Sequence, residues 1–65
     1  MILYKKLEYN RKLKRWLIQR VSDKKTIWVK TSWLELSGTK DGEGNKLFVA
    51  RSRTKAIRLD NADWK

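Results

Sequence analysis

The chain has no histidine, no cysteine and no proline, and only three glycines among its 65 residues. Without cysteine there is no disulfide framework, no thiolate nucleophile and no cysteine-ligated zinc or iron–sulfur site. Without histidine, the commonest general base and the commonest transition-metal ligand are both missing. These absences move the expectation from catalysis toward binding.

Long apolar segments are missing as well. Runs such as Met1 to Tyr4 and Trp16 to Ile18 are far too short for a membrane-spanning helix or the core of a signal peptide. Hydrophobic residues still make up 40% of the chain, four of them tryptophan, which argues against a disordered chain. We therefore expect one folded domain over residues 1–65, intracellular (cytoplasmic) and without a membrane partner.

Charge of one sign is abundant and unevenly distributed. The chain holds 17 Lys or Arg against 7 Asp or Glu, a net charge of +10. Residues 1–30 carry ten cations against two acids (net +8), residues 31–50 two against three (net −1) and residues 51–65 five against two (net +3). A small domain with one basic side is expected to bind an anionic partner, although a solvated charged surface is the plainer alternative.

Strands are predicted over most of the chain. Residues 26–36 and 46–52 are rich in β-branched and aromatic residues, and a bend leads from the second into a short strand at 55–59. Residues 37–45 hold all three glycines and predict a flexible hairpin loop with positive-φ positions. Residues 60–65 are expected to form a polar tail that Trp64 docks onto the domain.

The N-terminal third fits two structures. Leu3, Leu7, Leu13 and Leu17 come close to helical spacing, whereas residues 2–9 and 13–21 also alternate as strands. A turn at 22–25 favours the strands, since it would pair Val21 with Thr26 and Ile18 with Val29. One face of that hairpin would then be mostly apolar and the other mixed; the apolar face carries Trp16, Ile18, Ile27, Val29 and Trp33, and the mixed face Arg15, Leu17, Gln19, Trp28, Lys30 and Ser32.

The predicted fold class is therefore all-β, a small five-stranded antiparallel barrel of the SH3-like or OB type. The alternative is an N-terminal helix packed on a three-stranded antiparallel sheet. Phe48 is assigned to the core with Trp16 and Trp33, and at most one of Tyr4 and Tyr9 faces inward.

The acidic residues do not suggest an active site. Asp41 and Glu43 flank a glycine in the loop, and Asp60 and Asp63 lie in the tail. The loop has neither the spacing of a phosphate-binding loop nor the ligand pattern of a calcium loop, and no serine has a histidine partner. We expect no enzyme, no metal site and no cofactor.

Nucleic-acid binding matches the residues that are present, because it requires several cations on one face and exposed aromatic side chains among them. Trp28 is the predicted stacking residue, and Arg51 and Arg53 are expected to share a strand face and clamp phosphates. The full predicted site comprises Lys5, Arg11, Lys12, Lys14, Arg15, Arg20, Trp28, Lys30, Arg51 and Arg53. No short signature distinguishes DNA from RNA or names a known module.

Two further functions fit the same residues. A protein-interaction or inhibitor module, of viral or mobile-element type, would dock its basic face on an acidic partner protein, since Arg and Trp also dominate protein interfaces. The second of these functions is self-association into a homodimer through pairing of edge strands.

Overall fold

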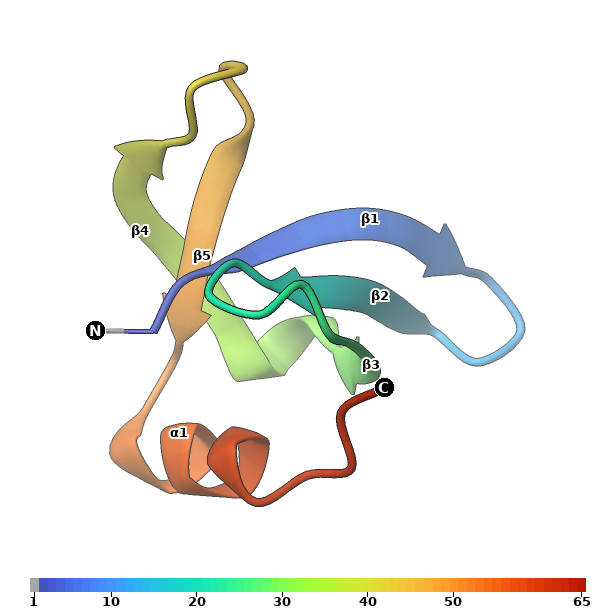
Figure 1. Cartoon of the computed structure of the whole chain (residues 1–65). Coiled ribbons are helices and arrows are strands. Elements are labelled where there is room, and N and C mark those ends of the chain that lie inside the picture. The colour runs from blue at the N-terminus through green and yellow to red at the C-terminus, as the bar shows by residue number, and fades with distance from the viewer. Residues whose placement is uncertain (1) are drawn as a thin grey trace.

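A computed structural model describes residues 2–65 of the chain, which form five strands, one 3-10 turn and one short helix. In chain order these are β1 (Tyr4–Asn10), β2 (Arg15–Arg20), β3 (Thr26–Lys30), η1 (Thr31–Trp33), β4 (Leu34–Lys40), β5 (Lys46–Ala50) and α1 (Arg53–Asp60) (Figure 1). The strands pair antiparallel in the order β3-β2-β1-β5-β4.

The five-stranded antiparallel sheet confirms the main part of the prediction, but the sheet is not closed into a barrel. β1 and β5 pair only at Tyr4 with Phe48 and at Lys5 with Leu47, after which the two strands diverge (Figure 1). The alternative with an N-terminal helix is wrong, because residues 4–10 and 15–20 are strands.

The β2–β3 hairpin keeps the predicted faces in a different register. Gln19, rather than Val21, lies opposite Thr26, and Ile18 lies opposite Ile27. The turn is longer than predicted because Lys24 adopts a φ of 61° and donates its backbone N–H to the Arg20 carbonyl. A shift of two residues leaves every side chain on its predicted side, since side chains alternate with a period of two.

The predicted strand over 26–36 is interrupted. At Thr31–Trp33 the chain turns through a single 3-10 turn, and it then runs along the opposite edge of the sheet as β4. The Trp33 carbonyl accepts a hydrogen bond from Arg51 N–H at 2.8 Å, and the Trp33 ring packs against the core. The turn therefore buries an aromatic ring while it moves the chain from one sheet edge to the other.

The glycine-containing loop is shorter than predicted, because β4 continues to Lys40. Gly38 and Gly44 have φ values of 84° and 87°, so two of the three glycines occupy the expected positive-φ positions. Asp41 holds the remaining loop together: its carboxylate accepts hydrogen bonds from the backbone N–H groups of Glu43 and Asn45 and from the Asn45 side chain.

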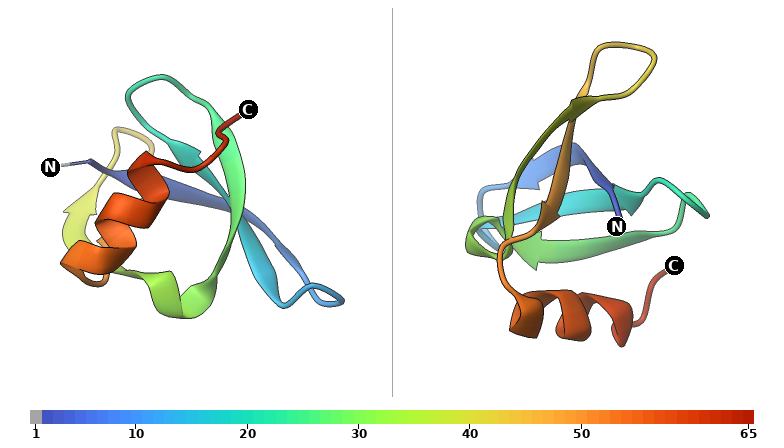
Figure 2. Two further views of the ribbon diagram at one scale, coloured as in Figure 1. Left: turned by 90° about the horizontal axis from the view of Figure 1, so that it is seen from below. Right: turned by 90° about the vertical axis from the view of Figure 1, so that its left-hand side faces the viewer.

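The predicted strand at 55–59 is wrong, because these residues belong to α1. The Ser52 hydroxyl accepts a hydrogen bond from Lys55 N–H at 3.3 Å and caps the helix. The residues that follow are mainly good helix formers, and Leu59 becomes fully buried against the sheet. The helix packs across the sheet as a second layer (Figure 2).

The core lies between the sheet and α1. Tyr4, Ile18, Val29, Leu34 and Leu59 form the buried cluster, and the rings of Trp16, Trp33, Phe48 and Trp64 pack against it. These contacts confirm the predicted inward face of the hairpin and the docking role of Trp64. The Trp64 ring stacks on Tyr4 with centroids 5.6 Å apart, and its indole N–H donates to the Leu59 carbonyl. Tyr9 lies opposite Trp16, with ring centroids 5.2 Å apart, because the register of β1 shifts between Lys6 and Glu8. Both tyrosines are therefore on the inner side of the sheet, although Tyr9 stays 44% exposed, and the prediction that at most one of them faces inward is wrong.

Candidate functional site

The mixed face predicted for the hairpin exists and extends over three strands. Leu17 lies directly between Glu8 and Trp28, and in the next row Arg15 lies between Asn10 and Lys30. Because directly opposed residues point to the same side of a sheet, these side chains share one surface, which we call the outer face. The outer face comprises Lys5, Glu8, Asn10, Arg15, Leu17, Gln19, Thr26, Trp28 and Lys30.

Trp28 occupies the position predicted for it. It is 37% exposed, at the edge strand β3, with Leu17 beside it on β2. The core tryptophans, by contrast, contact the buried cluster. A half-exposed indole on a rigid strand offers a flat surface for stacking at little entropic cost.

Arg15 and Lys30 place two like charges opposite each other across β2 and β3. Neither has a carboxylate within 4 Å among residues 2–65, where the ion pairs are Lys5 with Asp41 and Arg20 with Asp23. Like charges directly opposed across strands destabilise a sheet. An anion bound between these two side chains would remove that repulsion.

The turn between β1 and β2 adds three exposed cations at one end of the outer face: Arg11, Lys12 and Lys14. The Asn10 side chain accepts a hydrogen bond from Leu13 N–H at 3.0 Å, and Lys14 adopts a φ of 54°. This turn projects from the body of the molecule (Figures 1 and 2). It therefore presents its cations to a partner without steric hindrance from the rest of the domain.

Lys5 and Arg20 are already engaged within the protein. The Lys5 ammonium lies 4.0 Å from the Asp41 carboxylate. Arg20 donates two hydrogen bonds to Asp23 and lies over the Trp64 ring at 4.7 Å. These hydrogen bonds, led by those from Arg20, lower the pKa of Asp23 to about 2. Arg20, although it was predicted to bind nucleic acid, therefore contributes to the structure of the domain through these contacts.

Arg51 and Arg53 do not share a strand face. Arg51 follows β5 and Arg53 is the first residue of α1, so the two lie at the junction between strand and helix. Both are exposed. Neither residue belongs to β1, β2 or β3, the three strands that form the outer face. The prediction put them on one strand because it did not include a helix at residues 53–60.

Sequence reasoning also missed a set of cations that cover aromatic rings. The Lys6 ammonium lies 4.7 Å from the Trp16 ring centroid and 4.2 Å from that of Phe48, and partial burial lowers the pKa of Lys6. Lys55 and Arg58 lie over Trp33 in the same way. Such contacts stabilise a folded chain by about 0.5–1 kcal/mol each at exposed sites. Lys6, Lys55 and Arg58 therefore contribute to the packing of the domain as well as to its positive charge.

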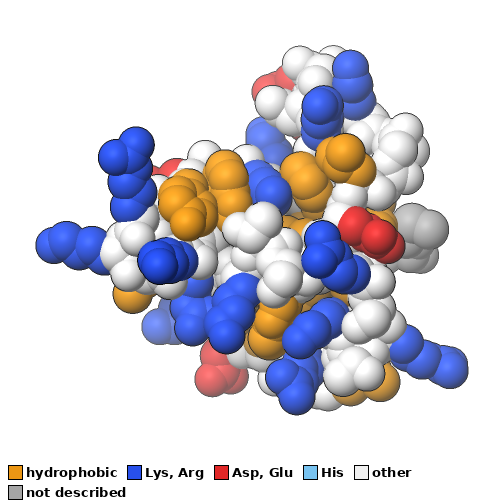
Figure 3. Space-filling model, turned by 180° about the vertical axis from the view of Figure 1, so that it is seen from behind, with side chains coloured by type: hydrophobic (Ala, Val, Ile, Leu, Met, Phe, Trp, Pro, Cys, Tyr) orange, Lys and Arg blue, Asp and Glu red, His pale blue; other side chains and the backbone are white. Residues whose placement is uncertain are grey.

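Hydrophobic and basic side chains alternate on the surface seen in Figure 3. Separate hydrophobic patches lie there with Lys and Arg side chains between and around them, and acidic side chains are few (Figure 3). Within residues 2–65 no group of three or more acidic side chains lies close enough to hold a metal ion. No helix in the same part of the chain is long and apolar enough to cross a membrane.

Comparisons with protein-family models, with curated proteins and with solved structures found no match to this chain.

Proposed function

We propose that the protein binds nucleic acid through the outer face and the adjoining β1–β2 turn, with limited sequence preference. The observation that carries this proposal is the Arg15–Lys30 pair, two uncompensated cations held opposite each other beside a half-exposed tryptophan. A phosphate between them converts a repulsive pair into two charge-assisted contacts. Trp28 then meets a base or sugar next to that phosphate.

The binding cations of this proposal are the cations of the outer face and the β1–β2 turn that have no carboxylate within 4 Å: Arg11, Lys12, Lys14, Arg15 and Lys30. Lys5 contributes less because of Asp41, and Arg20 supports the hairpin turn rather than the ligand. Arg51 and Arg53 serve at most as flanking phosphate contacts. Contacts to phosphates carry no sequence information, which is the reason for the limited sequence preference.

The proposal is tested by mapping the surface that an oligonucleotide perturbs. In an NMR titration with a 12-base-pair duplex and with a single strand of the same sequence, we expect the largest shifts at Arg15, Trp28 and Lys30 and in the β1–β2 turn. The Lys40–Lys46 end of the β4–β5 hairpin is the internal control, since it holds a second pair of opposed lysines on strands other than those that carry Arg15, Trp28 and Lys30. Equal shifts at both places would indicate nonspecific attraction and would refute the site.

Docking on an acidic protein remains the second candidate, because Trp28 flanked by Arg15 and Lys30 also suits a protein interface. The two functions differ in their response to nuclease. A complex isolated from cells that survives nuclease treatment and moderate salt supports the protein partner, whereas loss of the complex on nuclease treatment supports nucleic acid.

A further inference from the structure

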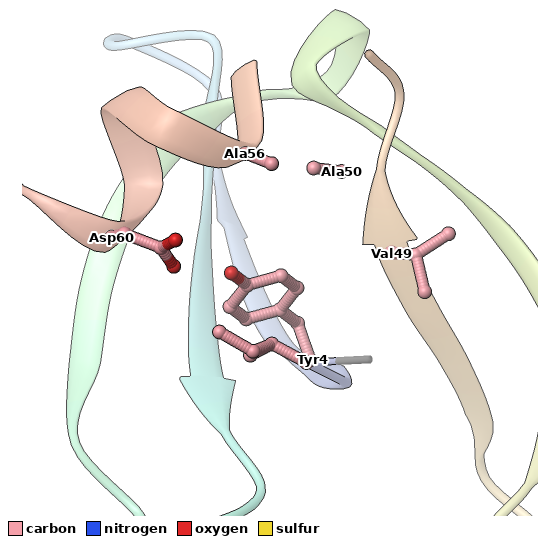
Figure 4. Close-up of a pocket in the computed structure, with 6 residues that line it drawn as sticks. Tyr4, Val49, Ala50, Ala56 and Asp60 are labelled. Carbon is pink, nitrogen blue, oxygen red and sulfur yellow. The ribbon is translucent and has the colours of Figure 1, made fainter. Parts of the chain in front are cut away.

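A pocket of about 310 Å³ opens between the sheet and α1, away from the outer face (Figure 4). Tyr4 and Val49 line it from the strands, and Ala50 and Ala56 face each other across the β5–α1 junction. The small side chains of these two alanines leave the space unfilled. Ile2 completes an apolar wall, and Asp60 stands at the rim.

The Tyr4 side chain brings a polar group into this apolar space. Tyr4 is only 2% exposed overall, yet within residues 2–65 its hydroxyl is not a buried polar atom without a partner, which fits an oxygen that is reached from the pocket. Figure 4 shows the hydroxyl directed toward α1, with the Asp60 carboxylate turned toward it (Figure 4). Burial, with the negative charge of Asp60, raises the pKa of Tyr4, so the phenol stays protonated and its oxygen can accept a hydrogen bond.

The pocket also has the opposite charge character to the rest of the protein. None of the 17 Lys and Arg residues lines it. Arg20, opposite Tyr4 on β2, acts electrostatically on both Tyr4 and Asp60, but Asp60 has no cation within 4 Å among residues 2–65. Asp60 is the last residue of α1, where the helix dipole already places partial negative charge. The rim therefore offers two oxygen acceptors, one of them a carboxylate, above an apolar cavity.

From this geometry we infer that the pocket binds a small alkylammonium ion. The alkyl chain lies against Tyr4, Val49, Ala50 and Ala56, and the ammonium group donates to the Asp60 carboxylate and the Tyr4 hydroxyl. An anion would meet the Asp60 charge, and a neutral alcohol would leave that charge uncompensated. The inference is independent of nucleic-acid binding, because it uses none of the outer-face residues.

The test is a titration at pH 7 and constant ionic strength with n-butylammonium, n-butanol and n-butyrate, followed through the methyl signals of Val49, Ala50 and Ala56. We expect saturable binding of butylammonium with a Kd on the order of 1–10 mM, reasonable for a ligand of five heavy atoms. Butanol should bind about threefold to fivefold more weakly, the range expected for one partly exposed ion pair, and butyrate more weakly still.

Two variants distinguish the contribution of the Asp60 charge to ligand affinity from that of the apolar cavity. Asp60→Asn should lower the butylammonium affinity to that of butanol while the domain stays folded, because it removes a negative charge from a helix C-terminus. Ala56→Leu should fill the pocket and abolish binding of both ligands, with an unchanged thermal midpoint as the check on folding. Equal affinities for butylammonium and butanol, or no saturable shift at all, would overturn the inference.

Discussion

Replacing Lys30 by Glu should change stability and binding in opposite directions. In the wild type Lys30 lies directly opposite Arg15, so Lys30→Glu converts a repulsive cross-strand pair into an attractive one. Cross-strand charge pairs are worth roughly 0.2–1 kcal/mol, so we expect a gain of about 0.5–1 kcal/mol in the free energy of unfolding. For a domain of this size, that gain raises the melting temperature by roughly 2–8 °C.

The same substitution should weaken nucleic-acid binding. It removes one phosphate contact directly, and a second because Arg15 then pairs with the new carboxylate. Each contact contributes about 0.9 to the slope of log K against log salt, so the slope should become shallower by almost 2. We expect the affinity for a duplex at about 0.1 M salt to fall between tenfold and a hundredfold, since each lost contact costs roughly tenfold.

Lys46→Glu is the matched control. It changes the net charge by the same amount and relieves the same kind of repulsion, because Lys46 lies opposite Lys40. It should therefore stabilise the domain as Lys30→Glu does, yet leave the slope unchanged. Thermal melts by circular dichroism and fluorescence anisotropy with a labelled duplex measure the two quantities. If both variants weaken binding equally, the reasoning about the outer face is refuted and only net charge matters.

Three other predictions follow from single contacts. Trp28→Ala should weaken binding to single strands while destabilising the domain by less than the about 3–5 kcal/mol typical of a core tryptophan; a loss in that range would show that the ring serves the core. Arg20 is the main cause that lowers the pKa of Asp23 to about 2. Ionised Asp23 should therefore stabilise the fold at any pH above the ordinary carboxyl pKa, and this stabilisation should be lost as the pH falls toward 2. Acid titrations of stability should be flatter for Asp23→Asn, and identical curves would contradict the role given to the pair. Ser52→Ala should cost about 1 kcal/mol in urea unfolding through the lost helix cap, and no change would mean that the 3.3 Å hydrogen bond contributes nothing.

Local alternation was enough to predict the β2–β3 hairpin and its two faces. The side-chain period of two places Trp16 and Ile18 on one side and Leu17 on the other, whatever the exact register. The register itself depends on Lys24, whose positive φ lengthens the turn, and a lysine gives no sequence signal for that conformation. This is why the position of Trp28 was predicted correctly although its partner was not.

Long-range contacts determined the features that the sequence did not reveal. Residues 53–60 follow an apolar strand and contain Thr and Ile, so they resemble a continued strand until the cap at Ser52 and the burial of Leu59 are considered together. The sheet is not closed, since β3 and β4 are its two edges, and nothing local shows this or the divergence of β1 and β5 after two pairs. The Lys6 contacts with Trp16 and Phe48 also join residues of three strands, since Lys6 lies opposite inward-facing Ile18.

The salt dependence of duplex binding tests the central claim most directly. With five cations free of carboxylate partners at the outer face and the β1–β2 turn, the slope of log K against log salt should be about −4 to −5. Anisotropy titrations with one labelled duplex between 50 and about 200 mM salt would measure it. A slope in that range supports phosphate binding by this surface, and no measurable binding at the lowest salt would contradict it.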